Sequence, residues 1–326
     1  MTLVQVTRKS GIPLVGALPF GIIDRGSNLL QIRCTTVCNM RCDFCSTSAN
    51  DSKKHPTNFI VDIPYLLEEV ERIAEFKGDN LIIFLDSVGE PTSHPQFVDL
   101  VKGLKKIKQV KEIIVITNGT LLTKERIDAL EKAGLDRINM SFHAMNPELA
   151  KKLFGMESYD VKKVIETIKY IKSKTKIDLM LTPVWLHKVN DEEIEKIIQF
   201  AKEIGCKIGI QNYEEHKYGR KMKEAKRENY FRFYRKLKDL EKKHDIKLVY
   251  GPRDFNITRT PRIETTMDLG EKINTKVLAD GWFEGQKIVS FKGRAISVRN
   301  CKAKPGDKIN LKVIENQNNI YLAEQK

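Results

Sequence analysis

The sequence lacks any apolar stretch near the roughly 20 residues that a membrane-spanning helix needs. Its N-terminus also lacks the basic start and unbroken apolar segment of a secretory signal peptide. These absences argue against a membrane or secreted protein. We therefore expect a cytoplasmic protein with no membrane partner.

Cysteine is scarce outside one short segment. Four of the six cysteines fall within residues 34–45, and the other two, Cys206 and Cys301, lie far from that segment and from each other. This distribution does not indicate a secreted disulfide framework. The segment CTTVCNMRCDFC therefore indicates a metal or redox site in a reducing compartment.

Acidic residues are fewer than basic ones. The chain has 43 Asp and Glu against 57 Lys and Arg, which gives a formal net charge of +14. Such an excess favours a polyanionic partner over an acidic or neutral one. A Lys/Glu-rich surface of the thermophilic kind is the alternative explanation.

Short β-branched segments alternate with amphipathic helical segments along most of the chain. The expected strands are 28–34, 81–85, 112–117, 135–141, 177–184 and 206–211, and the expected helices include 63–77, 95–108, 123–133, 159–174 and 191–204. This alternation predicts an α/β fold with a parallel sheet. Six βα units are too few for a full eight-fold barrel, so we expect a partial (βα)6 TIM-like barrel with ligands at the C-terminal strand ends.

The alternation of strand and helix patterns ends after residue 211, where a polar and highly charged segment begins. We interpret 1–27 as an N-terminal extension, 28–250 as the partial barrel, 251–266 as a linker and 267–326 as a small all-β barrel. Before the linker, a highly charged helix is expected to pack part of an aromatic patch on the partial barrel. That patch consists of Tyr230, Phe231, Phe233 and Tyr234.

Cys38, Cys42 and Cys45 are spaced C-x3-C-x2-C directly after the first expected strand of the partial barrel. Structural zinc usually takes four ligands in paired knuckles, and no second C-x2-C pair follows. Cys34 could complete a zinc set, but it lies on the incoming strand, where a small buried residue is the simpler explanation. Three thiolates on one loop suit a [4Fe–4S] cluster whose fourth iron stays open for a ligand.

The segment CNMRCDFC after a first βα-barrel strand resembles the radical S-adenosylmethionine (SAM) superfamily. The resemblance implies that Cys38, Cys42 and Cys45 hold a catalytic [4Fe–4S] cluster and that SAM chelates the fourth iron. One electron, from a donor such as ferredoxin or flavodoxin, then cleaves SAM to a 5′-deoxyadenosyl radical that abstracts hydrogen from substrate. Structural zinc is the alternative.

Other strand ends match further positions of this family over residues 28–215. The resemblance implies cofactor contacts at Phe44, Gly89, Glu90, Asn118, Ser141, Val184 and Gln211. Val88 stands where the family usually has the first glycine of a Gly-Gly-Glu-Pro element, which puts backbone details there in doubt. We interpret His143, His187 and His216 as loop or packing residues, with a position in the mouth of the partial barrel as the alternative. Cys206 is interpreted as a core residue and Cys301 as a turn or packing residue, with a substrate-trapping or methyl-carrying thiol as the alternative for Cys301.

The C-terminal segment from Gly281 resembles the TRAM domain, a small RNA-binding β-barrel. The likeness rests on the turn at residues 291–294, the turn at residues 304–307 and the closing strand. It implies base stacking and phosphate contacts. The candidate residues are Trp282, Phe283 and Phe291 for stacking, and Lys287, Lys292, Arg294, Arg299 and Lys302 for phosphates.

Together these features predict a radical SAM enzyme that modifies a nucleoside in RNA, with tRNA favoured over rRNA. The alternative substrate is a peptide or small metabolite, although such relatives often carry a cysteine-rich C-terminal extension that this sequence lacks. A non-enzymatic RNA-binding protein is disfavoured by the Gly89-Glu90 and Asn118-Gly119 elements. The resemblance also disfavours methylthiolation, because the TRAM-bearing enzymes of that kind carry an extra N-terminal domain with three more cluster cysteines, and residues 1–33 contain none. Carbon methylation and ring rearrangement stay open.

Overall fold

The computed structural model describes residues 1–325. The chain divides into two compact units. The first contains residues 1–39, residues 50–113 and the C-terminal segment from Ile257, and the second contains residues 40–49 and 114–256. Each unit is therefore built from segments that are distant in the sequence.

The first unit contains five strands and two helices ahead of the C-terminal segment. They are β1 (Thr2–Val6), β2 (Gly21–Asp24), β3 (Leu29–Arg33), β4 (Thr57–Val61), α1 (Ile63–Lys77), β5 (Leu81–Leu85) and α2 (Phe97–Leu104). Strand β3 pairs in parallel with β5 and antiparallel with β2. Strand β1 pairs in parallel with β4. The parallel β3–β5 pair carries the first two expected barrel strands.

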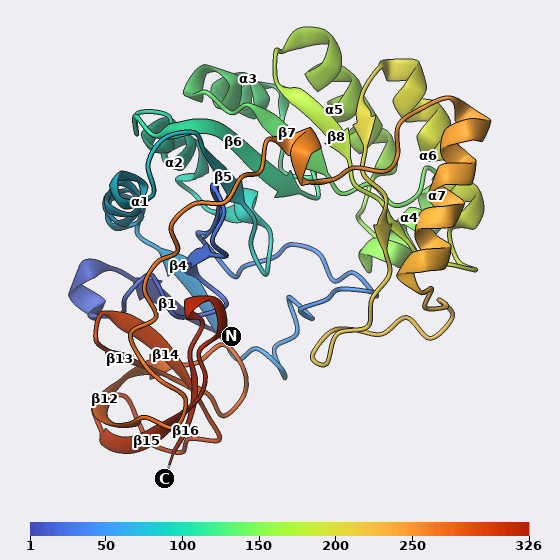
Figure 1. Ribbon diagram of the computed structural model, residues 1–326. Helices are drawn as coiled ribbons and strands as arrows, with labels where there is room; N and C mark the ends of the chain where they lie inside the picture. The colour runs from blue at the N-terminus through green and yellow to red at the C-terminus, as the bar shows by residue number, and fades with distance from the viewer. Residues whose placement is uncertain (326) are drawn as a thin grey trace. The chain divides into compact units, whose positions relative to one another are not determined.

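Strand β6 (Val110–Thr117) begins in the first unit and ends in the second. The second unit continues with α3 (Lys124–Ala133), β7 (Arg137–Met140), α4 (Pro147–Phe154), α5 (Val161–Lys174), β8 (Asp178–Leu181), β9 (Val184–Trp185), α6 (Asp191–Ile204), β10 (Lys207–Ile208), β11 (Gln211–Asn212) and α7 (Tyr230–His244). Strands β6, β7, β8 and β10 are parallel neighbours in that order, and β9 pairs in parallel with β11. Helix α5 packs on β8 and α6 on β10 (Figure 1).

Local sequence signals explain where the helices begin and end. Helix α4 begins after Asn146, whose Oδ1 accepts a hydrogen bond from the Leu149 amide at 3.0 Å, and Pro147 occupies its first turn. It ends at Gly155, whose φ of 63° is left-handed. These caps fix the end of α4, against which the cysteine segment packs.

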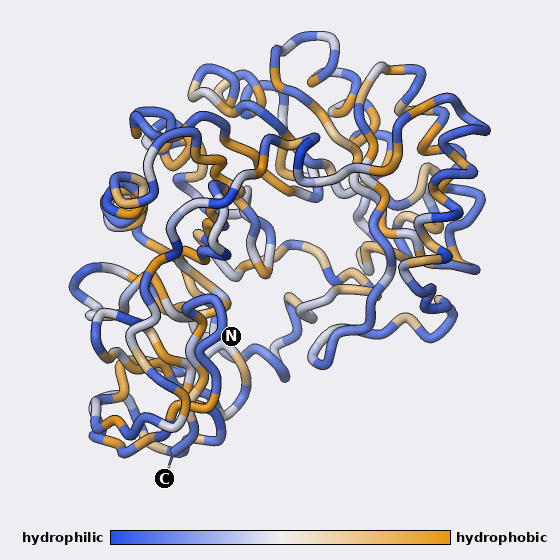
Figure 2. Tube along the Cα trace, in the orientation of Figure 1, coloured by the Kyte–Doolittle hydropathy of each residue, from blue (hydrophilic) through white to orange (hydrophobic). Residues whose placement is uncertain are grey.

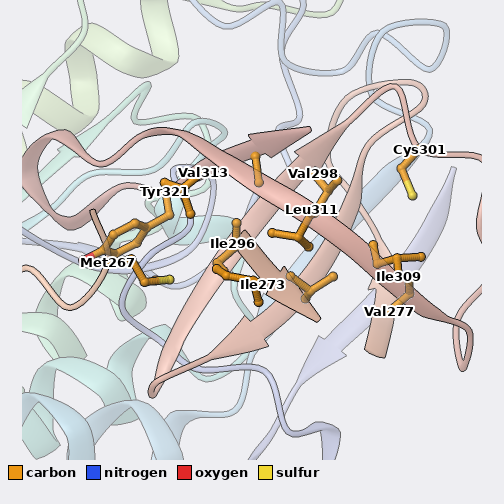
Figure 3. Close-up of a cluster of buried hydrophobic side chains, with 12 residues drawn as sticks. Met267, Ile273, Val277, Ile296, Val298, Cys301, Ile309, Leu311, Val313 and Tyr321 are labelled. Atoms are coloured by element: carbon orange, nitrogen blue, oxygen red, sulfur yellow. The ribbon is translucent and has the colours of Figure 1, made fainter. Parts of the chain in front are cut away.

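The C-terminal segment forms a small closed barrel. Its strands are β12 (Lys272–Asp280), β13 (Lys287–Phe291), β14 (Arg294–Arg299), β15 (Lys308–Glu315) and β16 (Leu322–Gln325), in the order β12-β13-β14-β16-β15. Figure 3 shows Ile273, Ile296 and Leu311 from three different strands pointing toward one another in its core. The small all-β barrel predicted for this region is confirmed and has five strands, and its TRAM identity stays a prediction.

The small barrel is packed against the N-terminal part of the first unit. The Ala295 amide donates to the Val15 carbonyl at 2.8 Å, and the Tyr321 amide donates to the Gly16 carbonyl at 2.9 Å. A Cβ atom at Gly16 would lie 2.1 Å from the Ala295 carbonyl oxygen, so only glycine permits this approach. Residues 1–27 thus contain the strands β1 and β2 and the backbone at Val15 and Gly16 that contacts the small barrel.

The expected strands and helices are largely present, and the α/β class is confirmed. The expected strands 177–184 and 206–211 are instead two short strands each. Strands β8 and β9 are interrupted at Thr182 and Pro183, and β10 and β11 at Gly209 and Ile210. The short helix α4 and the strands β1, β2 and β4 were not predicted. Across residues 1–325, no helix combines the length and apolar character needed to cross a membrane.

Candidate cofactor site

The segment that carries the three motif cysteines is held in place by backbone hydrogen bonds. Within the second unit, the Arg41 amide donates to the Phe154 carbonyl and the Asp43 amide to the Leu153 carbonyl, both at 3.1 Å. The Cys45 amide donates to the Cys42 carbonyl at 3.2 Å. The segment is therefore fastened to the C-terminal end of α4 by main-chain atoms.

Glycines line this segment at close range. A Cβ atom at Gly155 would lie 2.1 Å from the Arg41 carbonyl oxygen, and one at Gly219 would lie 2.9 Å from the Cys45 carbonyl oxygen. In the first unit, a Cβ atom at Gly89 would lie 2.3 Å from the Val37 carbonyl oxygen. Real Cβ atoms do not approach backbone atoms this closely, so each glycine is required by packing. The sequence motif predicted Gly89 but neither of the other two.

Arg220 is a further contact that the sequence did not reveal. Its Nε donates to the Cys42 carbonyl at 2.9 Å, its Nη1 to the Ala49 carbonyl at 2.8 Å, and its backbone amide to the Cys45 carbonyl at 2.8 Å. The first of these bonds spans 178 residues of sequence. Arg220 thereby joins both ends of the segment 42–49, acting as a positioning residue for two of the motif cysteines.

The three motif cysteines differ from the rest in exposure. Cys38, Cys42 and Cys45 are half-buried, whereas Cys34, Cys206 and Cys301 are buried. Burial raises the pKa of Cys34 to about 12 and that of Cys206 to about 12. Buried thiols of this kind stay protonated and make poor metal ligands. The structure therefore assigns Cys34 to the core, as the sequence indicated.

The surroundings of Cys42 suit a sulfur-rich group. The Tyr159 ring stacks on Phe154 with centroids 4.1 Å apart, and its buried hydroxyl has no hydrogen-bond partner among the described residues. Burial, followed by the charge of the Cys42 thiolate, raises the pKa of Tyr159, so this hydroxyl is a permanent donor. A cluster sulfur is an acceptor that such an orphaned donor fits. Within the second unit, the half-buried Cys42 and Cys45 and this donor thus have the chemistry that suits a [4Fe–4S] cluster.

No three His, Cys, Asp or Glu side chains within residues 1–325 are already grouped to hold a metal ion. Cys38 belongs to the first unit, and Cys42 and Cys45 belong to the second. The ligand roles of these three cysteines therefore stay a prediction.

The predicted cofactor residues of the first unit lie beside the segment that leads to Cys38. The Glu90 amide donates to the Val37 carbonyl at 2.8 Å, and Glu90 Oε1 accepts from the Thr92 amide at 3.1 Å and the Thr92 hydroxyl at 2.6 Å. These bonds hold the buried Glu90 carboxylate in one orientation. Val88 is buried, and its bulk does not prevent Gly89 from meeting residues 36–37.

Four predicted residues of the second unit follow strand ends, and they lie close together as two pairs. The Ser141 amide donates to the Thr117 carbonyl at 2.8 Å, which places Ser141 beside Asn118. Asn118 Oδ1 accepts from the Thr120 amide at 3.0 Å, closing the turn after β6. Val184 and Gln211 are register partners in the β9–β11 pair. Their contacts with SAM stay a prediction.

His143 connects two of these positions. Its Nδ1 accepts a hydrogen bond from the Val184 amide at 3.0 Å, and its ring contacts Phe44 edge-on with centroids 4.8 Å apart. Burial lowers the pKa of His143 to about 3, so the ring is neutral and carries its proton on Nε2. His143 is thus a packing residue, as the sequence indicated, but one that links the Phe44 and Val184 positions. His187 is also buried, and His216 is exposed.

The candidate RNA residues of the small barrel are placed unevenly. Trp282 is only 2% exposed and stacks on His55 with ring centroids 3.9 Å apart. The structure therefore does not support base stacking on Trp282, because its ring already packs inside the first unit. Phe291 is partly buried against the barrel core. The remaining candidates are half-buried or exposed: Phe283, Lys287, Lys292, Arg294, Arg299 and Lys302.

The parallel βα units and the cysteine segment that follows the first of them define the class of βα proteins that bind ligands at their C-terminal strand ends. The family model described as the Radical SAM superfamily matches residues 32–201. The chain belongs to this superfamily. The family's cofactors are a [4Fe–4S] cluster and SAM, which confirms the cofactor prediction. When both are bound, the reduced cluster would supply the electron that cleaves SAM.

The chain is similar to several known proteins. An uncharacterised protein of Methanocaldococcus jannaschii is 34% identical over 96% of this chain and 78% of its own length. A probable GTP 3′,8-cyclase of Saccharolobus islandicus is 36% identical over 54% of this chain, and the match spans about half (53%) of the cyclase. Among solved structures, TYW1 with a lysine–pyruvate adduct has a TM-score of 0.51 at 16% identity and covers 73% of this chain and 80% of TYW1. SuiB of Streptococcus suis with SAM has a TM-score of 0.50 at 18% identity and covers 75% of this chain and 52% of SuiB. The two structural likenesses concern the fold alone.

We expect Arg220→Ala to loosen the cysteine segment, because it removes the guanidinium bonds to the Cys42 and Ala49 carbonyls. When a buried carbonyl loses a charged hydrogen-bond donor, the folded state is destabilised by roughly 1–3 kcal/mol. Limited proteolysis of the cluster-free protein should therefore show faster cleavage within residues 42–49. The control is Arg227→Ala, which changes an exposed arginine that, like Arg220, lies between β11 and α7. Equal cleavage rates in wild type and Arg220→Ala would refute the positioning role.

Proposed function

We propose that this radical SAM enzyme modifies a nucleoside within RNA, with tRNA as the first substrate to test. Its small barrel is proposed to capture the RNA, and the reaction needs an external one-electron donor. The observation that carries the proposal is the closed five-stranded barrel, whose cations lie outside a self-contained apolar core in a chain of net charge +14. Small barrels with basic outer surfaces commonly bind nucleic-acid backbones.

The ion pairs of these cations do not prevent phosphate binding. Lys292 Nζ lies 2.8 Å from a Glu271 oxygen, and Arg299 Nη2 lies 3.4 Å from a Glu324 oxygen. Both pairs are solvent-exposed, and exposed pairs contribute about 0–1 kcal/mol. A phosphate can replace these carboxylates at small cost.

The second candidate substrate is a small purine nucleotide. It is favoured by the similarity of the βα region to the probable GTP 3′,8-cyclase, which exceeds 30% identity. Outside the motif, this chain has only the buried Cys34, Cys206 and Cys301. Among residues 1–325, no further cysteine is therefore evident as a ligand of an additional cluster. A two-cysteine methyl-transfer reaction would need an accessible second thiol, and none is evident among the same residues.

Substrate-dependent cleavage of SAM distinguishes the two candidates. Cluster-loaded protein with dithionite should form 5′-deoxyadenosine faster when unmodified tRNA transcripts are added, and GTP should leave the rate unchanged. Acceleration by GTP with no response to RNA would contradict the proposal.

We also expect the double variant Arg299→Ala/Lys302→Ala to bind tRNA more weakly, because fewer phosphates are neutralised and fewer counterions are released on binding. The slope of log affinity against log salt should fall in magnitude by roughly one for each phosphate that is no longer neutralised. Lys111→Ala, an exposed lysine outside the barrel, is the control. An unchanged salt slope in the double variant would exclude the barrel as the capture surface.

A further inference from the structure

We propose that the outer face of helix α7 is a second docking surface for single-stranded RNA, distinct from the small barrel. We define this α7 face by Phe231, Tyr234, Arg235, Lys238 and Lys242. The inference deepens the proposed function and rests on it, because it assigns the same class of substrate to a surface of the second unit.

Helix α7 has one packed face and one that faces solvent. Phe233, Leu237 and Leu240 are buried. The residues of the α7 face follow the i, i+3, i+4, i+7, i+11 spacing of a single helical side, opposite the buried one. All five are exposed, and Phe231 is 77% and Tyr234 42% exposed. Large aromatic rings held in water need a functional explanation more than single aliphatic residues do.

The α7 face combines flat rings with cations. The Arg235 guanidinium lies 5.9 Å from the centre of the Phe231 ring. Residues 216–247 contain thirteen Lys and Arg against five Asp and Glu, which is more than half of the excess positive charge of the chain. Figure 2 shows the tube over α7 as largely hydrophilic. Interleaved rings and cations match the alternating bases and phosphates of a single strand.

The helix begins beside the strand ends that carry predicted cofactor residues. Asn212, at the end of β11, donates through its Nδ2 to the Glu228 carbonyl at 2.7 Å, two residues before α7 begins. The Trp185 ring of β9 contacts Phe233 with centroids 6.2 Å apart. At the far end, Lys202 of α6 donates to the His244 carbonyl at 2.7 Å. The α7 face is thus held at a fixed position relative to the C-terminal strand ends of its unit, where βα barrels bind substrate.

A membrane surface is a weaker match for the same helix. Helices that lie on membranes insert a continuous apolar face. In α7 the aliphatic residues Leu237 and Leu240 face inward, and the outer face has only two rings among three cations. RNA is therefore the occupant that the charge and the rings favour.

The test compares RNA affinity in full-length variants. The probes are an unmodified tRNA transcript and a single strand of about 12 nucleotides, a length that one stacking surface can hold. We expect Phe231→Ala/Tyr234→Ala to weaken binding of the single strand roughly tenfold, because each substitution removes the ring on which a base would stack. Arg235→Gln/Lys238→Gln should lower the salt slope. Phe76→Ala, which removes an exposed ring of α1, is the control.

Each result bears on a separate claim. Affinity for the single strand that is unchanged in both α7 variants would overturn the inference while leaving RNA modification open. Loss of binding to phosphatidylserine vesicles without loss of RNA binding would also overturn it. Weakened RNA binding, together with cellular RNA that is unmodified by the enzyme, would uphold the α7 face and refute the proposed function. Unchanged melting temperatures would show that the variants are folded.

Discussion

Replacing Cys42 by alanine is expected to abolish reductive cleavage of SAM and to lower bound iron to near background. Two thiolates do not hold a [4Fe–4S] cluster that normally has three protein ligands. The segment itself should keep its shape, because its bonds to Leu153, Phe154 and Arg220 use main-chain atoms of the segment. Iron and sulfide analysis, electron paramagnetic resonance and 5′-deoxyadenosine assays measure the loss.

The matched control for this variant is Cys206→Ala. Cys206 is buried directly before β10, and its raised pKa keeps the thiol protonated. The control should retain iron and SAM cleavage, and the Cys42 variant should retain tRNA affinity. Full SAM cleavage in Cys42→Ala would contradict the assignment of this cysteine as a cluster ligand.

Adding one methyl group at Gly89 is expected to weaken SAM binding by at least about tenfold. The new Cβ would lie 2.3 Å from the Val37 carbonyl oxygen and 2.4 Å from the Thr36 carbonyl oxygen. Such overpacking costs roughly 1–3 kcal/mol. Relieving it requires a shift of either Glu90 or the backbone that leads to Cys38. Equilibrium dialysis with SAM on cluster-loaded protein measures the change.

Gly251→Ala provides the comparison, because a Cβ atom there would meet nothing within 4 Å and the φ of −123° suits any residue. A melting temperature measured for both variants separates loss of binding from loss of folding. Wild-type SAM affinity in Gly89→Ala would show that the turn after β5 takes no part in holding SAM.

The sequence predicted the regular elements best where local signals were strong. Strand β5 and helices α1 and α6 have the predicted bounds, because continuous apolar segments and clear helix caps mark them. Strands β1, β2 and β4 were not predicted, since their pairing depends on partners elsewhere in the chain. The segment around β8 and β9 was predicted as one strand, although Pro183 lacks the amide that a continuous strand needs.

The candidate site was predictable only as far as its residues lie in local motifs. The cysteine spacing and the Gly89-Glu90 pair are short patterns, so they were found. The contacts of Arg220 and Gly219 with the cysteine segment join residues more than 170 positions apart, and no local pattern reports them. Trp282 was expected to bind RNA because tryptophan often stacks on bases, whereas its burial against His55 is a tertiary effect.

RNA is the substrate that we propose for this radical SAM enzyme. Mass-spectrometric profiling of nucleosides in total tRNA and rRNA, from cells with and without the protein, tests it most directly. We expect the loss of one modified nucleoside from tRNA and its return with the wild-type gene but not with the Cys42→Ala variant. An unchanged nucleoside profile in both RNA classes would contradict RNA modification by this enzyme.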